Sequence, residues 1–315
     1  MRRKSILLLL PLFAVLAAAA PPPSREIAIT FDDLPLGGPE VGLPRLRTMT
    51  AALLATLKRE GVTAVGLVNE SKLYRPGEID ERTAILRDWL EAGHELGNHT
   101  FSHPSFYDTP LAAFQEDVIR GETVTRMLLA EKGQKLRYFR HPFLRTGPTL
   151  ETRAAFEKFL AERGYTVAPV TVENADYVYN AIYTRAKTKG DEETMRRMVE
   201  GYVRYTEAQL DFQEGVARKL LGRPLRHVLL LHANELNADA LDEVLALFKR
   251  RGYRFVTLER ALEDDAYRLP DTYAGRAGVS WLFRWTRSQG VPIDWSQEPE
   301  PPEEVRKMYE ATLGR

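Results

Sequence analysis

The chain has 315 residues, balances 44 basic against 44 acidic side chains, and contains no cysteine. This neutral balance lacks the basic footprint of proteins that bind nucleic acids or anionic membranes. Without cysteine the chain forms no disulfides and no thiolate sites, so any metal must be held by His, Asp, Glu or water.

The first twenty residues are typical of a secretory signal peptide. Met1–Lys4 is positively charged, Ile6–Ala19 is almost entirely apolar, and Ala18–Ala20 offers small residues for cleavage. The apolar stretch is shorter than the roughly 20 residues that a membrane-spanning helix needs, and no later stretch approaches that length. We therefore expect an exported bacterial protein, periplasmic or extracellular, whose mature chain has no membrane span. An uncleaved N-terminal anchor is the alternative.

Strand and helix candidates alternate along the rest of the chain, and most helix candidates are followed by a glycine that ends them. The expected strands are Ile27–Phe31, Thr63–Val68, His94–Gly97, Leu136–Arg140, Tyr165–Val170, His227–Leu231 and Arg254–Leu258. The expected helices are Leu46–Glu60, Ile79–Ala92, Leu111–Lys132, Thr149–Arg163, Glu192–Leu221 and Ala238–Arg251.

Repeated strand–helix units predict a mainly parallel sheet. We expect one domain, a distorted (β/α) barrel of about seven strands formed by residues 21–265. A helical insert at about residues 180–225 and a C-terminal extension, 266–315, exceed the minimal barrel. The extension carries Trp281, Phe283 and Trp285, which we expect to pack on the barrel, although part of it can stay loose. A sugar-stacking platform is the alternative for these aromatic residues.

Chemically capable side chains follow the C-terminal ends of the expected strands, the face on which parallel barrels carry their active sites. Asp32 and Asp33 follow the first strand, and His99 and His103 follow the third. One carboxylate and two imidazoles hold a divalent metal while leaving positions for water and substrate. The spacing of the histidines predicts one helical turn, which Pro104 would end at His103.

Two further motifs end strands, Arg140-His-Pro-Phe143 and Leu230-Leu-His232. In this order, the motifs resemble those of the polysaccharide deacetylase family, the NodB-homology group classed as carbohydrate esterase family 4. The resemblance spans about Ile27 to Leu262. The third motif departs from the family's usual Arg-Pro-Pro-Tyr-Gly. The fourth, Asp176-Tyr-Val-Tyr179, keeps only part of the usual Asp-x-x-Asp-Trp.

The resemblance implies a metal site with a base beside it. Asp33, His99 and His103 would bind the metal, and Asp32 would take a proton from the attacking water. A carboxylate is ionised at neutral pH and can accept that proton. Zinc is the expected metal, and cobalt or nickel would suit the same donors.

The resemblance also implies the remaining roles around the substrate. His232 would be the general acid, because an imidazole titrates near neutrality. Arg140 would pair with Asp32, and Asp176 would be the acidic partner of His232. The backbone N–H of Phe143 is a candidate oxyanion donor, and Tyr179 is a candidate aromatic wall of the substrate site.

Together these features predict a metal-dependent hydrolase that removes N-acetyl groups from a carbohydrate of the polysaccharide or peptidoglycan type. Its partner is an acetylated sugar rather than a nucleic acid. An O-acetyl esterase on the same fold is one alternative, because amide and ester hydrolysis pass through the same kind of oxyanion. A catalytically inactive protein that binds metal and saccharide is the other.

Overall fold

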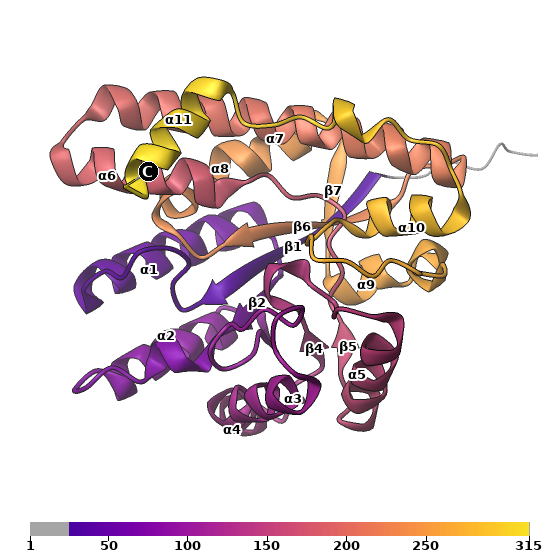
Figure 1. The fold of residues 1–315 in the computed structure, drawn as a ribbon. Helices are drawn as coiled ribbons and strands as arrows, with labels where there is room; N and C mark the ends of the chain where they lie inside the picture. The colour runs from indigo at the N-terminus through magenta and orange to yellow at the C-terminus, as the bar shows by residue number, and fades with distance from the viewer. Residues whose placement is uncertain (1–24, 315) are drawn as a thin grey trace, which may run out of the picture.

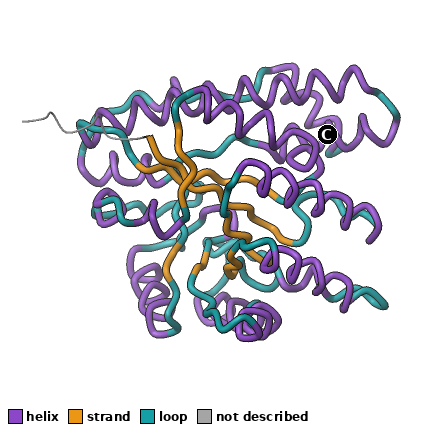
Figure 2. Tube along the Cα trace, turned by 180° about the vertical axis from the view of Figure 1, so that it is seen from behind, coloured by secondary structure: helices purple, strands orange, loops and turns teal. Residues whose placement is uncertain are grey.

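The computed structural model describes residues 25–314, so the predicted signal peptide, residues 1–20, lies outside the described residues. Seven parallel strands form one sheet that curls into a half-barrel with helices around it (Figure 1). Figure 2, which shows the molecule from behind, has the helices arranged around the strands. The predicted distorted (β/α) barrel of parallel strands is confirmed.

The strands are β1 Arg25–Leu34, β2 Ala64–Val68, β3 Glu95–Asn98, β4 Tyr138–Phe139, β5 Thr166–Val167, β6 Arg226–His232 and β7 Tyr253–Val256. The α-helices are α1 Leu43–Glu60, α2 Ile79–Glu91, α3 Leu111–Arg120, α4 Thr123–Glu131, α5 Leu150–Glu162, α6 Asp176–Lys189, α7 Glu192–Leu221, α8 Glu235–Arg250, α9 Leu258–Leu262, α10 Trp281–Gln289 and α11 Glu303–Thr312. Short 3₁₀ segments are η1 Glu70–Leu73, η2 Pro142–Leu144, η3 Asp265–Arg268 and η4 Trp295–Gln297.

The strand order of the sheet is β5-β4-β3-β2-β1-β6, and β7 also pairs with β1. Strand β1 therefore has three strand partners. Its apolar residues are almost fully buried, which explains a continuous run of β-branched and aromatic residues in this strand. One edge of β1 pairs with β6, and the other is shared by β7 and β2. The β1–β6 register places Asp32 directly opposite His232.

The chain after β5 crosses to the other edge of the sheet. Val172 forms a parallel bridge with Leu229 of β6, and its carbonyl accepts the N–H of Leu230 at 3.0 Å. This contact brings the start of α6, with Asp176, beside the C-terminal end of β6. The two edges of the half-barrel are thereby joined at the level of the site.

The long helix α7 has the bounds that the sequence predicts. Asp191 caps its first turn by accepting the N–H of Thr194, and Gly222 ends it in a left-handed conformation. Its periodic stripe is buried: Met198, Tyr202, Tyr205 and Gln209 face the protein interior.

Two helix predictions differ from the structure. The predicted helix Leu111–Lys132 is wrong: α3 ends at Arg120 and α4 begins at Thr123. At the break, Gly121 packs so closely on the loop after β3 that a Cβ there would lie 2.5 Å from the N atom of Phe101. Helix α6 was predicted only in part, because the expected helical insert at about residues 180–225 misses its first turn. Its buried side includes the polar residues Asp176 and Asn180 and so lacks a clean apolar stripe.

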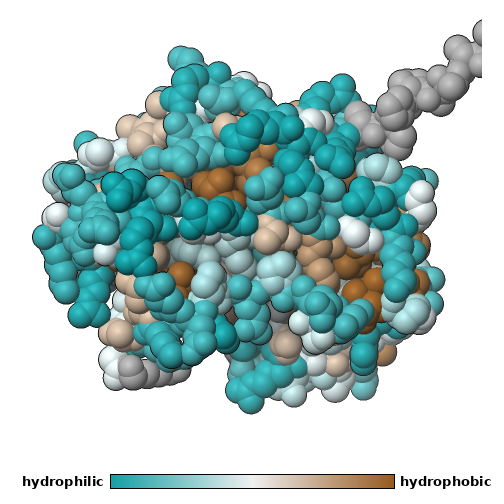
Figure 3. All heavy atoms as spheres, turned by 90° about the horizontal axis from the view of Figure 1, so that it is seen from above, coloured by the Kyte–Doolittle hydropathy of each residue, from teal (hydrophilic) through white to brown (hydrophobic). Residues whose placement is uncertain are grey.

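The C-terminal extension packs against the rest of the protein through α10 and α11. Trp281 and Trp285 are buried, which does not suit an exposed sugar-stacking platform. Helix α11 runs along α6, where Arg185 donates to the carbonyl of Ala311 at 3.0 Å (Figure 1). The face that carries α7 and α11 is mostly hydrophilic, with small apolar patches (Figure 3). Within residues 25–314, no helix is both long and apolar enough to cross a membrane.

Candidate active site

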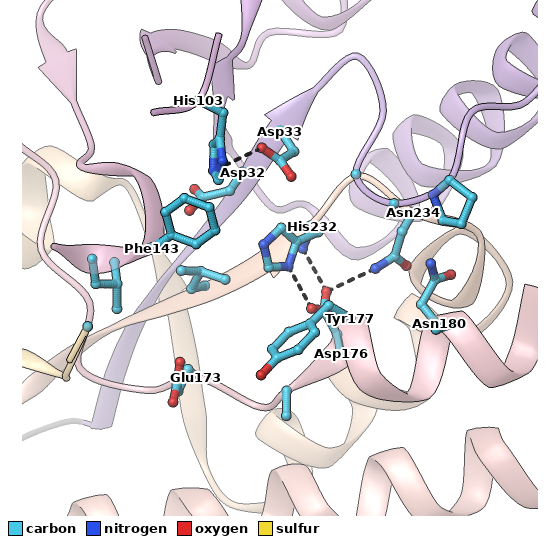
Figure 4. A pocket seen from close by; sticks show the side chains of 18 of the residues that line it. Asp32, Asp33, His103, Phe143, Glu173, Asp176, Tyr177, Asn180, His232 and Asn234 are labelled. Atoms are coloured by element: carbon cyan, nitrogen blue, oxygen red, sulfur yellow. Dashed lines mark hydrogen bonds and ion pairs between the residues drawn. The ribbon is translucent and has the colours of Figure 1, made fainter. Parts of the chain in front are cut away.

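Asp33, His99 and His103 converge at the C-terminal ends of β1 and β3. Each offers one ligand atom, and these atoms all lie within 4.8 Å of one another. The Oδ1 atom of Asp33 is 3.6 Å from Nε2 of His103 and 3.9 Å from Nε2 of His99. Figure 4 shows the Asp33 carboxylate pointing toward the ring of His103. Residues far apart in the sequence therefore form one group that could hold a metal ion.

The predicted helical turn at His99–His103 is wrong, because these residues form a loop. Thr100 and His103 have positive φ angles of 70° and 60°, which no helix contains. The carboxylate of Asp117 in α3 holds the loop by accepting the N–H groups of Phe101 and Ser102, both at 2.9 Å. Side-chain contacts, rather than helical backbone bonds, thus bring the two imidazoles together.

The donor atoms are in the protonation state that a cation requires. His99 donates its Nδ1–H to the carbonyl of Arg140 at 2.9 Å, which leaves Nε2 facing Asp33. Burial lowers the pKa of both imidazoles, to about 4 for His103, so both are neutral at pH 7.

Asp33 also fits a divalent cation. Burial alone would raise its pKa, but the charges of Lys72 and the nearby imidazoles hold the pKa below its usual value. Its Oδ1 atom is buried and accepts no hydrogen bond within the described residues, and its charge faces Nζ of Lys72 at 3.2 Å. Two neutral imidazoles and one carboxylate match a zinc-type donor set.

Sequence reasoning missed Lys72, whose Nζ lies 3.2 Å from Oδ1 of Asp33 and 2.9 Å from the carbonyl of Leu36. Lys72 belongs to η1, just after β2. One signal in the sequence could have indicated Lys72: it follows a strand of a parallel barrel, as the other chemically capable residues do. Lys72 ties the loop after β1 to the strand next to it.

Asp32 forms a buried ion pair with Arg140, as the resemblance implies. The Nη1 atom of Arg140 lies 2.5 Å from Oδ1 of Asp32 and donates to Oγ1 of Thr30 at 2.8 Å. Arg140 also donates its Nε–H to the carbonyl of Ala168 at 3.0 Å. Asp32 and Arg140 are almost completely buried. This fixed guanidinium orients the carboxylate, whose Oδ2 atom is 3.7 Å from Nε2 of His99.

Asp176 holds His232 by both of its oxygens. Oδ1 lies 2.6 Å from Nδ1 of His232, and Oδ2 accepts the backbone N–H of the same residue at 2.7 Å. Asn234 and Asn237 also donate to Oδ2. Burial by itself lowers the pKa of His232, but the charge and hydrogen bond of Asp176 outweigh it and raise the pKa to about 9. At neutral pH the imidazole is therefore protonated.

This raised pKa predicts a pH-dependent contribution to stability in metal-free protein. The pKa of His232 rises from 6.5 to about 9 on folding, which corresponds to about 3 kcal/mol. The contribution is complete below pH 6.5, where both states bind the proton, and is lost as the pH rises through about 9. Folding lowers the pKa of the Asp176 carboxyl group below its ordinary value of 3.8. This carboxylate therefore adds stability above pH 3.8, and the added stability is lost as the pH falls below that value.

We expect the free energy of unfolding of wild type to exceed that of His232→Gln most near pH 6, and the difference to close toward pH 10. Urea unfolding in the presence of a chelator measures it. A difference that is constant with pH would contradict the pairing.

These groups line one cavity of about 620 Å³. On one side Phe143, 52% exposed, packs its ring edge-on against His103 with 4.4 Å between centroids. On the other side Tyr177 contacts the ring of His232, and Glu173 lies beyond it (Figure 4). Helix α11 adds Tyr309 to the wall.

Tyr179, the predicted aromatic wall, is not brought to the cavity. It is fully buried against Tyr202 and Tyr205 of α7. The aromatic residue of this motif that lines the cavity is Tyr177, two positions earlier. Helix α6 begins at Asp176, earlier than the predicted insert, and residues two apart point to different sides of a helix.

Backbone strain gathers around the site. All non-glycine residues with positive φ within residues 25–314 lie in the segments that form it: Asp33, Thr100, His103, Phe143, Leu144 and Ala175. Such conformations cost energy and persist where the surrounding structure holds them, which is a common property of functional sites.

A parallel half-barrel that presents a His-His-Asp group at its strand ends has the architecture and donor set of metal-assisted hydrolases. The model of the polysaccharide deacetylase family matches residues 19–166. The peptidoglycan-N-acetylglucosamine deacetylase of Bacillus cereus is 24% identical over 240 residues, which cover 74% of this chain and 66% of that relative. The chain thus spans just under two thirds of this relative.

Two solved structures share the fold. The peptidoglycan deacetylase PdaC of Bacillus subtilis has a TM-score of 0.50 and 21% identity, over 79% of this chain and 95% of that one. The CE4 family pseudoenzyme BA3943 of Bacillus anthracis has a TM-score of 0.51 and 16% identity, over 76% of this chain and 66% of that one. Residues 19–166, just under half of the chain, thus match a polysaccharide deacetylase domain.

Proposed function

We propose that this protein is a metal-dependent hydrolase that removes N-acetyl groups from a carbohydrate. One observation carries the proposal: a group able to hold a metal, the carboxylate of Asp32, which Arg140 pairs from behind, and a charged Asp176–His232 pair line the same cavity. A base, an acid and a cation site side by side are the parts that acyl hydrolysis requires.

Asp33, His99 and His103 would hold the cation. When bound, a divalent metal polarises the acyl carbonyl and acidifies water. Zinc suits the two imidazoles and one carboxylate, and cobalt or nickel are accepted by the same donors.

Asp32 is the proposed base. Its carboxylate lies beside the metal ligands, since Oδ2 is 3.7 Å from Nε2 of His99. Arg140 holds the other oxygen at 2.5 Å and fixes the orientation of the carboxylate. The ionised carboxylate accepts a proton from the attacking water, and its fixed orientation avoids the entropy cost of positioning it for each turnover.

His232 is the proposed acid, which protonates the leaving amine as the tetrahedral intermediate collapses. The Asp176 carboxylate fixes the tautomer by accepting from Nδ1, so the Nε2 proton is available toward the cavity. The backbone N–H of Phe143, at the cavity wall, is the proposed donor to the oxyanion. Tyr177 replaces Tyr179 as the proposed aromatic wall for a sugar face.

The substrate class rests on the relatives. The Bacillus cereus relative is named for peptidoglycan N-acetylglucosamine, which supports an acetylated amino sugar of a cell-wall polymer as the substrate. Export to the periplasm or exterior would bring the protein to that polymer, and the N-terminal sequence supports export.

The test is an acetate-release screen on purified, metal-analysed protein. We expect about one divalent ion per chain and equal release of acetate and free amine from N-acetylglucosamine oligomers or peptidoglycan. Acetate without amine, from O-acetylated xylan alone, would replace the proposal with an O-acetyl esterase.

A metal-loaded protein that hydrolyses none of these substrates would favour the inactive binding protein. That alternative has some support, because a structural neighbour is described as a pseudoenzyme. The presence of Asp32, Arg140 and His232 in paired geometry speaks for turnover.

A further inference from the structure

The loop that carries Phe143 is held by a residue of the C-terminal extension. Arg284, in α10, is completely buried. Its Nη2 atom donates to the carbonyl of Leu144 at 2.6 Å, and its Nη1 atom donates to Oγ1 of Thr146 at 2.7 Å. A planar guanidinium that makes two such bonds fixes both the position and the orientation of its partners.

The loop needs this support because its backbone is strained. Phe143 and Leu144 have consecutive positive φ angles of 55° and 53°. A left-handed conformation is unfavourable for a bulky residue, so two in a row persist only where other contacts impose them. This strained conformation places Phe143 against His103, at the wall of the cavity.

A second part of the extension presses on the same loop. Gly278 lies so close to it that a Cβ at this position would be 1.7 Å from the carbonyl oxygen of Phe143. Arg284 is in turn fixed by its neighbours: the ring of Trp281 lies 4.6 Å from its guanidinium carbon, and Asp271 lies 3.6 Å from its Nη1 atom. The extension therefore contacts the strained loop at two separate points.

We propose that the C-terminal extension is a working part of the active site, in which Arg284 is a positioning residue that holds the Phe143–Leu144 backbone so that the N–H of Phe143 faces the oxyanion. The claim that this loop serves the oxyanion rests on the proposed deacetylase function. The claim that Arg284 holds the loop rests on the contacts alone.

The main test compares Arg284→Met with Arg287→Met, a control on the same helix whose side chain is exposed. We expect Arg284→Met to raise the hydrogen-exchange rate of the amides of residues 143–146 at least tenfold. It should lower kcat about 10- to 100-fold, approaching the cost of removing one oxyanion donor. Metal content, KM and the pH profile of kcat/KM should stay near wild type, because ligands, base and acid are untouched. The control should change none of these.

Gly278→Ala is the second variant, in case Arg284→Met folds poorly. Gly278 lies in an exposed loop, and a methyl group added there must displace the Phe143–Leu144 backbone that it meets. We expect the same fall in kcat and the same faster exchange, with metal content near wild type.

The outcomes separate the two claims. Wild-type kcat in folded Arg284→Met and Gly278→Ala would overturn the positioning role. So would a loss of kcat that only matches a loss of folded, metal-loaded protein. If wild type hydrolyses no acetylated sugar, the proposed function fails, and the exchange rates alone decide whether Arg284 holds the loop.

Discussion

Replacing His99 by alanine is expected to release the metal and abolish hydrolysis while the barrel still folds. His99 supplies one of three ligand atoms, and its Nδ1–H bond to the carbonyl of Arg140 fixes the direction of the other nitrogen. With two ligands left, the affinity for the cation falls steeply, because a catalytic zinc site uses three protein ligands. Metal analysis after gel filtration, with acetate release in parallel, measures both effects.

His94→Ala is the matched control for that variant. His94 directly precedes the same strand, β3, at its opposite end, is equally buried, and accepts the N–H of Ala64 at 3.3 Å. Its loss should cost a similar amount of packing but leave the metal and the turnover in place. Unchanged metal content in His99→Ala would remove His99 from the ligand set, and equal metal loss in both variants would point to general destabilisation.

Replacing His232 by glutamine is expected to lower turnover by about 10² to 10⁴ while sparing the metal, the usual range for the loss of a general acid. His232 contacts Asp176 rather than the metal ligands, so metal content should not change. The alkaline fall in kcat/KM that the protonated imidazole imposes should disappear in the variant. Steady-state kinetics across pH, at a fixed metal concentration, measures both changes.

His227→Gln provides the control on the same strand. His227 lies at the other end of β6, is fully buried and contacts Oγ1 of Thr171 at 3.1 Å. Its replacement should leave turnover near wild type. Near-normal activity of His232→Gln would end the acid role, while an equal loss in both variants would indicate a defect of the strand.

The residues that the sequence placed correctly belong to strong local patterns at strand ends. Asp32, Asp33 and His232 follow apolar strands, and neighbouring parallel strands end at one edge. The register of β1 and β6 therefore brings these residues together wherever the barrel forms. The metal group depends on the same rule, because β2 joins β1 to β3.

What the sequence did not predict depends on contacts between distant segments. The histidine loop has the spacing of a helical turn, but Asp117, in a later helix, holds it in another shape. Tyr177 rather than Tyr179 faces the cavity because α6 starts at Asp176. Arg284 acts on Leu144 from 140 residues away, and no local pattern records such a contact.

The bridge between Val172 and Leu229 has a consequence for the two halves of the proposed site. Asp176 follows Val172 closely, so the contact that closes the half-barrel also brings the carboxylate to His232. The proposed metal ligands, in contrast, come from the ends of β1 and β3 and do not depend on that bridge. A change that opens the bridge is therefore expected to weaken the proposed acid while leaving the proposed cation site assembled.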